Sequence, residues 1–193
     1  MKRDQLWEAM LNGEETAFSK IYEQYAYRLL AYGSKITFDE TIVKDAIQDV
    51  FVRLWNNRKT ISSVSNVKVY LFKSLRNRLY KILELEKRYE QEIAEDKNPT
   101  VISCIEDAII LSELKKEQLL KLHHYLQKLP THQREAIHLR FFQNLQITEI
   151  AALMDVNNQS VSNSIYRGLN TLRSKLLPAQ MSTFSKKTKD SSK

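Results

Sequence analysis

The chain has 193 residues, enough for one large domain or two small ones, and 42% of them are hydrophobic, so it can bury packed cores. Only three Gly and three Pro favour long helices with few loops, and a single cysteine, Cys104, excludes an internal disulfide framework and fits a reducing cytoplasm. The formal net charge of +7 points towards a polyanion. The sequence contains neither an apolar run of membrane-spanning length nor a signal-peptide core, so we expect a cytoplasmic protein without membrane insertion.

The charge is divided into blocks along the chain. Residues 53–88 carry ten basic and two acidic side chains, whereas residues 89–110 carry one basic and six acidic side chains. Residues 111–177 are again basic, with nine basic and five acidic side chains. Two positive blocks separated by an acidic stretch predict two modules that face nucleic acid.

A helix is predicted over residues 39–57, because the apolar residues of DETIVKDAIQDVFVRLWNN repeat at spacings of three and four. Asp45, Gln48, Asp49 and Val52 then lie together on the opposite side. A solvated surface is the simpler interpretation of this patch. Its acidic character, directly before the most basic block, makes it poorly suited to DNA, so any partner is expected to be a basic protein surface.

The basic block is predicted to form a polar loop at residues 62–66 and a helix over residues 67–88. One side of that helix is apolar, and the other is expected to expose Phe72, Lys73, Arg76, Asn77 and Tyr80. Cations interleaved with rings and an amide suit single-stranded DNA, since cations hold the backbone and rings stack on bases. The alternative is a solvated basic helix, although such a helix would not usually expose Phe72.

The last part of the chain predicts a helix-turn-helix. Pro130 ends one helix and Thr131 is expected to cap the next. Asp155 lies in the later tight turn, where it tolerates a left-handed conformation, and Asn157 is expected to cap the final helix. The buried stripe of that helix is predicted to contain Val161, Ile165, Leu169, Leu172 and Leu176. Its opposite, polar face suits the major groove of DNA, although an ordinary amphipathic helix would show the same pattern.

Motifs for catalysis are nearly absent. The sequence contains no Gly-rich phosphate loop and no Cys-x-x-Cys. Glu135 and His138 form a single Glu-x-x-His, and a two-metal helical bundle would need further carboxylate ligands. We therefore expect no catalytic residue, no metal site and no cofactor.

Four blocks in order resemble the bacterial extracytoplasmic-function (ECF) sigma factors. They are DAIQDVFVRLW, NVKVYLFKSLRNRLYK, LPTHQREAIHLRFFQNLQITEIAALM and VSNSIYRGLNTLR, and the resemblance covers roughly residues 5–177. In style the chain is most similar to the iron-citrate-type factors common in Bacteroidetes. The resemblance implies an all-α chain of two small helical domains joined by a flexible linker, the second domain containing the helix-turn-helix.

The resemblance also implies the domain limits and partners. Residues 1–95 would form sigma region 2, residues 96–108 a linker that threads core polymerase, residues 109–177 sigma region 4, and residues 178–193 a basic disordered tail. The expected partners are core RNA polymerase, through its beta-prime clamp and beta flap, promoter DNA, and a membrane-bound anti-sigma factor.

Three sets of site residues follow from the resemblance. The set expected to bind core polymerase is Asp45, Gln48, Asp49, Val52 and Trp55. The set expected to capture the minus-ten strand is Ser63, Asn66, Phe72, Lys73, Arg76, Asn77 and Tyr80. The set expected to bind the minus-35 duplex is Asn158, Gln159, Ser160, Ser162, Asn163 and Arg167. Many relatives have cations at the positions of Ser162 and Ser164, so weaker minus-35 contacts are expected here.

Two other hypotheses remain open at this point. One is a helix-turn-helix regulator that binds an operator without being a polymerase subunit. Residues 1–95 show neither the alternating strands nor the acidic pocket of a receiver domain. The other is a helical metal enzyme resting on Glu135 and His138.

Overall fold

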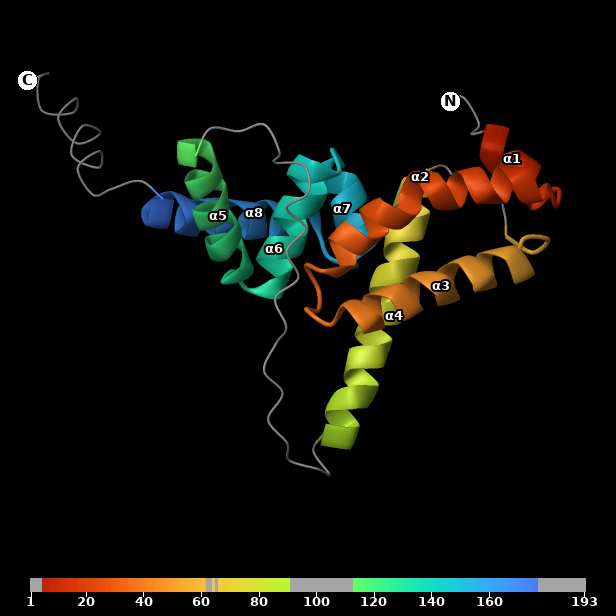
Figure 1. Ribbon diagram of the computed structural model, residues 1–193, viewed down its shortest axis with the longest axis horizontal. Coiled ribbons are helices and arrows are strands. Elements are labelled where there is room, and N and C mark those ends of the chain that lie inside the picture. The colour runs from red at the N-terminus through yellow and green to blue at the C-terminus, as the bar shows by residue number, and fades with distance from the viewer. Residues whose placement is uncertain (1–4, 62–63, 65, 91–112, 177–193) are drawn as a thin grey trace, which may run out of the picture.

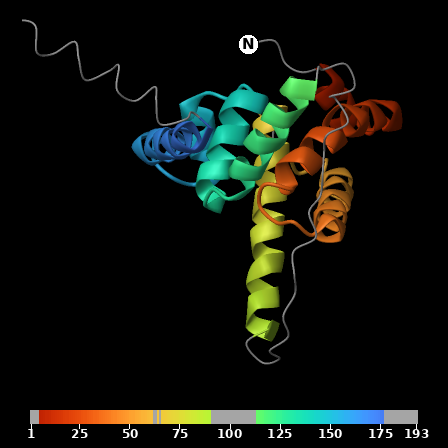
Figure 2. The ribbon, with the colours of Figure 1, turned by 60° about the vertical axis from the view of Figure 1, so that its left-hand side comes forward.

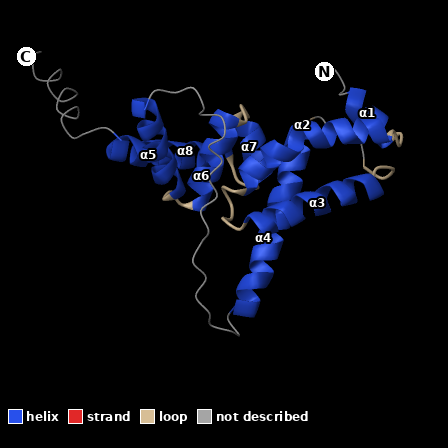
Figure 3. Cartoon of the chain, viewed as in Figure 1, coloured by secondary structure: helices blue, strands red, loops and turns tan. Residues whose placement is uncertain are grey.

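The structure, a computed structural model, describes residues 5–61, 64, 66–90 and 113–176, and every regular element in this part of the chain is a helix (Figures 1 and 3). The elements are α1 Gln5–Leu11, α2 Glu15–Gly33, α3 Glu40–Asn56, α4 Val67–Glu90, α5 Glu113–Gln127, α6 Thr131–Ile137, the π-helix η2 His138–Phe142, α7 Ile147–Met154 and α8 Asn158–Leu176. None of these helices is both long and apolar enough to cross a membrane. Ser63, Cys104, the predicted linker 96–108 and the predicted tail 178–193 lie outside the described residues.

We call α1–α4 the N-terminal module. Its helix α3 begins where predicted, because the Asp39 carboxylate accepts hydrogen bonds from the backbone N–H groups of Thr41 and Ile42 at 2.9 and 3.2 Å. Its apolar side is buried as the spacing predicted, through Val43, Ala46, Ile47, Val50, Phe51 and Leu54. These residues fix α3 against α2 and α4.

We call α5–α8, with η2, the C-terminal module. Helix α7 ends at Asp155, which has φ 56° and ψ 45°, so the left-handed turn expected there is present. The Asn157 side chain accepts from the Ser160 backbone N–H at 2.7 Å, which confirms the predicted cap of α8. The cap expected from Thr131 is wrong: α6 begins at Thr131 itself, after Pro130, and shows no side-chain cap.

The buried stripe of α8 differs from the prediction at one position. Val161 and Leu172 are buried, but Leu169 is 40% exposed and Gly168 is buried in its place. At about 100° per residue, steps of four rotate a stripe by about 40° each time, which carries Leu169 off the face that Val161 defines. Gly168 lies close to that face, and its missing side chain lets α8 approach Ile137 of α6.

The two modules pack against each other through α4 and α7. Figures 1 and 2 show α5–α8 gathered beside the C-terminal end of α2 and the N-terminal half of α4, while the C-terminal half of α4 extends away. Buried residues from both modules form one continuous hydrophobic cluster, which includes Tyr32 and Phe72 from one side and Leu139 and Ile150 from the other. Helix α4 is therefore covered on two sides.

The close approach at Gly168 predicts a steric effect. A Cβ built there would lie 2.6 Å from Ile137 Cδ1, so Gly168→Ala should lower the free energy of unfolding by about 1–3 kcal/mol despite the better helix propensity of Ala. Urea denaturation would measure this loss. Ile137→Val removes the clashing methyl, so in the double variant the two losses should not add. Additive losses would show that α6 and α8 do not meet at this point.

Candidate nucleic-acid and protein interfaces

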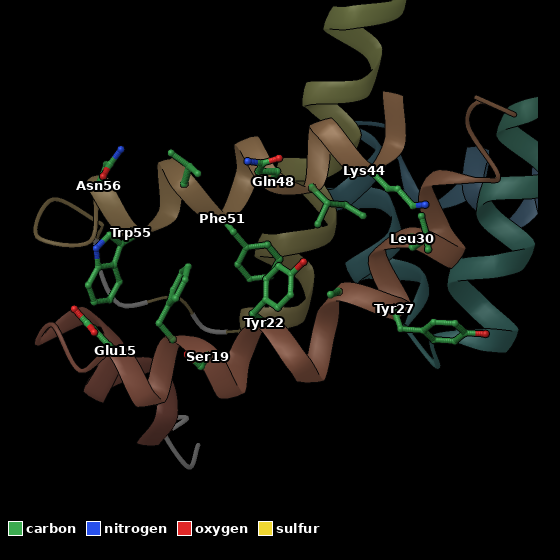
Figure 4. Close-up of a pocket in the computed structure, with 14 residues that line it drawn as sticks. Glu15, Ser19, Tyr22, Tyr27, Leu30, Lys44, Gln48, Phe51, Trp55 and Asn56 are labelled. Atoms are coloured by element: carbon green, nitrogen blue, oxygen red, sulfur yellow. The ribbon is translucent and has the colours of Figure 1, made fainter. Parts of the chain in front are cut away.

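An apolar groove runs between α2 and α3, with a volume of about 930 Å³ (Figure 4). Gln48, Val52 and Trp55 line it, so three of the five residues expected to bind polymerase share one surface. Val52 is 50% exposed although it is apolar. The floor is aromatic: the Phe18 ring lies 5.0 Å from the Trp55 ring, and the Tyr22 ring lies 4.9 Å from the Phe51 ring.

The α2 side of this groove was missed by the sequence prediction. Phe18 and Tyr22 had been interpreted as ordinary packing residues of the second helix, yet Tyr22 is 46% exposed. The signal that could have found them is that apolar residues cover more of α2 than one neighbouring helix can bury. A wide apolar arc on an outer helix indicates a further partner.

The acidic part of the predicted patch is weaker than expected. Asp45 is exposed on α3, but the Asp49 carboxylate forms an ion pair with Arg78 of α4. Asp49 therefore ties α3 to α4 inside the N-terminal module. The surface that remains free for a partner is mainly an apolar groove with a polar rim.

Phe72 was expected on the exposed face of α4, and this expectation is wrong. Its side chain is fully buried, and its ring lies 5.2 Å from the Tyr32 ring. The reason is that α4 lies between two packed layers, α2 and α3 on one side and α7 on the other, so it buries a wider arc than a surface helix does.

Glu135 of α6 is the centre of the contact between the modules. Its side chain is fully buried and accepts hydrogen bonds from Arg76 Nε at 3.0 Å, from the Tyr32 hydroxyl at 3.2 Å and from the Tyr80 hydroxyl. The Arg76 guanidinium also lies 4.4 Å above the Tyr80 ring. All three donors belong to the N-terminal module, so the charge of Glu135 is balanced across the interface.

Burial raises the pKa of the Tyr32 and Tyr80 hydroxyls, and the negative charge of Glu135 raises both further. Both hydroxyls therefore keep their protons and donate to the carboxylate. Such a network is needed because an unpaired buried carboxylate would cost several kcal/mol. Glu135 is thus bound to three protein groups, and the hypothesis of a metal enzyme loses one of its two proposed ligands.

His138 takes part in the same interface. Its ring stacks between the rings of Tyr32, at 6.1 Å, and Phe142, at 5.3 Å, and one ring nitrogen lies 3.1 Å from Gln143 Nε2. Among the residues that the structure describes, no group of three or more His, Cys, Asp or Glu side chains could hold a metal ion.

Three more contacts join polar groups of the minus-ten set and its surroundings to the C-terminal module. Lys73 Nζ donates to the Asp155 carboxylate at 2.6 Å and to the Ala152 carbonyl at 2.8 Å. Asn66 Nδ2 donates to the Glu149 carboxylate at 2.7 Å, and Lys68 Nζ donates to the Gln143 carbonyl.

The minus-ten set is therefore divided by the structure. Asn66, Lys73, Arg76 and Tyr80 contact the C-terminal module, whereas Asn77 is exposed to solvent. The sequence prediction brought these residues to one helix and its preceding loop, and it gave no sign of the contacts that cover them.

The expected minus-35 face is open on α8. Asn158, Gln159, Ser160, Asn163 and Arg167 are all exposed. Gln159 Nε2 donates to Asn163 Oδ1 at 3.1 Å, which holds the two amides side by side.

Two positions on α8 differ from the expected face. Ser162 is half-buried and donates to the Asn158 carbonyl at 3.0 Å, so its hydroxyl is used within its own helix. Tyr166 was not predicted, yet it is 67% exposed beside Arg167. Its position three residues after Asn163 was the available signal.

The comparisons with known proteins follow the two modules. Residues 21–89 match the family described as Sigma-70 region 2, and residues 119–172 match Sigma-70, region 4. The two matches cover α3, α4 and the helix-turn-helix in the family's order. The chain therefore belongs to the Sigma-70 proteins. It is a polymerase-binding sigma factor, a transcription initiation factor rather than a catalyst.

Two Bacillus subtilis (strain 168) relatives are similar along most of their length. The ECF RNA polymerase sigma factor SigX is 24% identical over 82% of this chain and 83% of its own, and the RNA polymerase sigma factor SigV is 26% identical over 83% and 90%. The fold resembles that of RpoE in complex with the anti-sigma factor NepR from Bartonella quintana, with a TM-score of 0.69, 22% identity and coverage of 82% and 96%. It also resembles CnrH in complex with the cytosolic domain of CnrY, with a TM-score of 0.61, 20% identity and coverage of 88% and 93%.

The burial of His138 predicts a pH dependence of folding. Burial, followed by the charge of Lys35, lowers the pKa of His138 to about 3, below its ordinary 6.5. Between these values the unfolded chain binds the proton more readily, so the stability present above pH 6.5 is lost as the pH falls towards 3. The loss from this group should be about 2 kcal/mol at pH 5.

Urea denaturation at pH 7 and pH 5 would measure this effect. His138→Gln should reduce the difference between the two pH values by that amount, whereas His124→Gln, at an exposed position of α5, should leave it unchanged. An identical pH dependence in the His138 variant and the wild type would contradict the prediction.

Proposed function

We propose that this chain directs core RNA polymerase to its promoters through three surfaces and has no catalytic residue of its own. The α2–α3 groove binds polymerase, α4 and its preceding loop capture the minus-ten strand, and α8 reads the minus-35 duplex. The observation that carries the proposal is the order of these surfaces on two helical modules that match Sigma-70 regions 2 and 4. We further propose that the protein acts in the cytoplasm.

The groove is suited to a helical partner. Its floor of aromatic rings would take the apolar stripe of a helix, while Gln48 and Asn56 at its edge would hydrogen-bond the polar side. The beta-prime clamp coiled coil is the proposed occupant. Asp45, exposed on the same helix, adds negative charge that favours a basic partner, and Asp49 contributes indirectly by holding α3 against α4.

The minus-ten surface is proposed to capture bases that have left the duplex. Unstacking a base costs a few kcal/mol, and contacts to the displaced strand would offset that cost. Asn77, which is exposed, is proposed to hydrogen-bond a base edge, while Lys73 and Arg76 hold phosphates and Tyr80 offers a ring. Phe72 supports this surface from beneath by packing on Tyr32.

The minus-35 surface is proposed to depend on hydrogen bonds more than on charge. Arg167 is the one cation among the exposed members of the predicted set, and Ser160 and Asn163 are short side chains suited to base edges. Tyr166, exposed beside Arg167, is added to this surface. The beta flap is proposed as the polymerase element that holds the C-terminal module, with the segment 96–108 threading the enzyme between them.

An anti-sigma factor is proposed as the regulatory partner, anchored in a membrane. Support comes from the two similar structures, one of which contains the anti-sigma factor NepR and the other the cytosolic domain of CnrY. We also propose that the chain belongs to the iron-citrate-type ECF group, with region 2 in residues 1–95, region 4 in residues 109–177, and a basic tail at 178–193.

Reconstitution with core RNA polymerase tests the function. The purified chain should join core enzyme on size-exclusion chromatography and direct initiation at a small set of sites on fragmented genomic DNA. Core enzyme alone and core enzyme with a heat-unfolded chain are the controls. A chain that binds DNA fragments without joining core polymerase would instead support an operator-binding regulator.

The groove makes a specific prediction. Val52→Glu places a charge on the apolar groove, so association with core polymerase should weaken by about 10-fold or more, because a charge would be buried against an apolar partner. The free energy of unfolding should change by less than about 0.5 kcal/mol, as is usual at exposed positions. Gln24→Glu, at an exposed position of α2 outside the groove, is the matched control. Unchanged affinity in a folded Val52 variant would contradict the assignment.

The recognition helix makes a second prediction, measured by holoenzyme binding to the promoters found above. Arg167→Ala should make the dependence of log affinity on log salt shallower by about 0.9, because one phosphate contact is lost. Asn163→Ala should instead cost about 1–3 kcal/mol on the matching minus-35 sequence and little on unrelated duplexes. Arg173→Ala, at an exposed cation on another side of α8, should leave the salt dependence unchanged. Equal salt effects of the two arginine substitutions would place the DNA on a different face.

A further inference from the structure

The contact between the modules covers the same polar groups that the proposed function assigns to DNA. Arg76 and Tyr80 donate to the Glu135 carboxylate, and Lys73 donates to the Asp155 carboxylate. These acceptors come from α6 and from the turn before α8. Each carboxylate presents a negative charge and acceptor oxygens, as a DNA phosphate does.

The neighbouring contacts follow the same chemistry. Asn66 donates to the carboxylate of Glu149, and Lys68 donates to the Gln143 carbonyl. Burial lowers the pKa of Lys68, so this cation is partly removed from water by the contact. Five donors on α4 and the residue before it are thus matched by three carboxylates and two backbone carbonyls of the C-terminal module.

We propose that the C-terminal module acts as an intramolecular competitor of minus-ten DNA, whose carboxylates hold the α4 donors until the modules separate. The proposal rests on the proposed function of α4. Because both partners belong to one chain, the competitor acts at a high effective concentration, and a free DNA strand must displace it. We call the arrangement in the structure the closed form.

Dimensions give an independent reason for separation. The minus-ten and minus-35 elements lie about 25 base pairs apart, roughly 85 Å along B-DNA at about 3.4 Å per base pair. Lys73 contacts Asp155, so the rise of about 1.5 Å per helical residue places Asn77 and Asn163 within about 40 Å of each other. The closed form cannot hold both elements of one straight promoter.

The closed form nevertheless leaves two other surfaces accessible. Gln48 and Val52 are exposed at the α2–α3 groove, and Asn163 and Arg167 are exposed on α8. Polymerase can therefore dock before the modules separate, whereas the donors on α4 stay covered. The inhibition is directed at strand capture.

Glu135 is the residue through which the closed form can be tested. Glu135→Gln keeps the size of the side chain and removes its charge, so it weakens the bonds to Arg76, Tyr32 and Tyr80 together. Glu40→Gln is the matched control: it makes the same change in net charge and breaks an ion pair with Lys44 on the surface of α3. Asp155→Asn is a milder second variant, since Asn also tolerates the left-handed turn.

The first measurement is the affinity of the free, full-length chain for a fluorescent single strand of mixed sequence about 12 nucleotides long, within the length that single-strand sites cover. Glu135→Gln should bind this strand about 10-fold or more tightly than the wild type, and Asp155→Asn about 2- to 3-fold more tightly. Glu40→Gln should bind as the wild type does.

The second measurement is the distance between spin labels at Lys59 and Ser174, two exposed positions at the ends of α3 and α8, with Cys104 replaced by Ser. The wild type should give one narrow distance, and Glu135→Gln should add a broad population at longer distances. Addition of the strand should shift the wild type in the same direction.

The proposal is overturned if folded Glu135→Gln shows wild-type distances and wild-type strand affinity, or if it binds the strand less tightly. If that variant does not fold, Asp155→Asn decides, and wild-type values for it overturn the proposal. Association with core polymerase separates this failure from failure of the proposed function: a chain that joins polymerase and initiates transcription, yet shows no effect of either substitution, contradicts the closed form alone.

Discussion

The buried charge of Glu135 is the constraint on which the arrangement of the two modules depends. A carboxylate without contact with water must be balanced by donors, and here the balance comes from Arg76, Tyr32 and Tyr80 across the interface. Water could replace these donors if the modules separated, whereas it could not fill the apolar contacts beside them. The polar part of the interface therefore fixes how the modules meet, and the apolar part supplies most of the attraction.

Helix α4 connects the N-terminal core to this interface. Its apolar residues pack on α2 and α3, and its opposite side reaches α7. Because one rigid helix carries both contacts, Phe72 is buried beneath the same surface that presents Lys73 and Arg76. A change in the packing of Tyr32 or Phe72 would therefore move the polar groups above them, which couples the N-terminal core to the proposed minus-ten surface.

Local features were predictable from sequence because they depend on neighbours in the chain. The repeat of apolar residues placed α3, and the chemistry of Asp155 and Asn157 placed the turn before α8. The error at Leu169 has the same local origin, since a spacing of four residues drifts off a helical face.

Contacts between distant parts of the chain were not predictable in this way. Glu135 lies 103 residues from Tyr32 and 59 from Arg76, and no spacing pattern joins them. Phe72 was misplaced for the same reason, because a helix that is covered on two sides has the sequence of a surface helix with one unusually wide apolar arc. The roles of the site residues also depend on partners, polymerase and DNA, whose surfaces are not encoded in this chain.

The π-helix at His138–Phe142 has a consequence for the lengths that this segment tolerates. The Gln143 backbone N–H bonds the His138 carbonyl, five residues earlier, so the segment holds one residue more per turn than an α-helix would. Deleting a single residue here would restore an ordinary helix and rotate everything after it by about 100°. Glu149 and Asp155 would then turn away from Asn66 and Lys73, so natural insertions and deletions should be far rarer in this segment than amino-acid replacements.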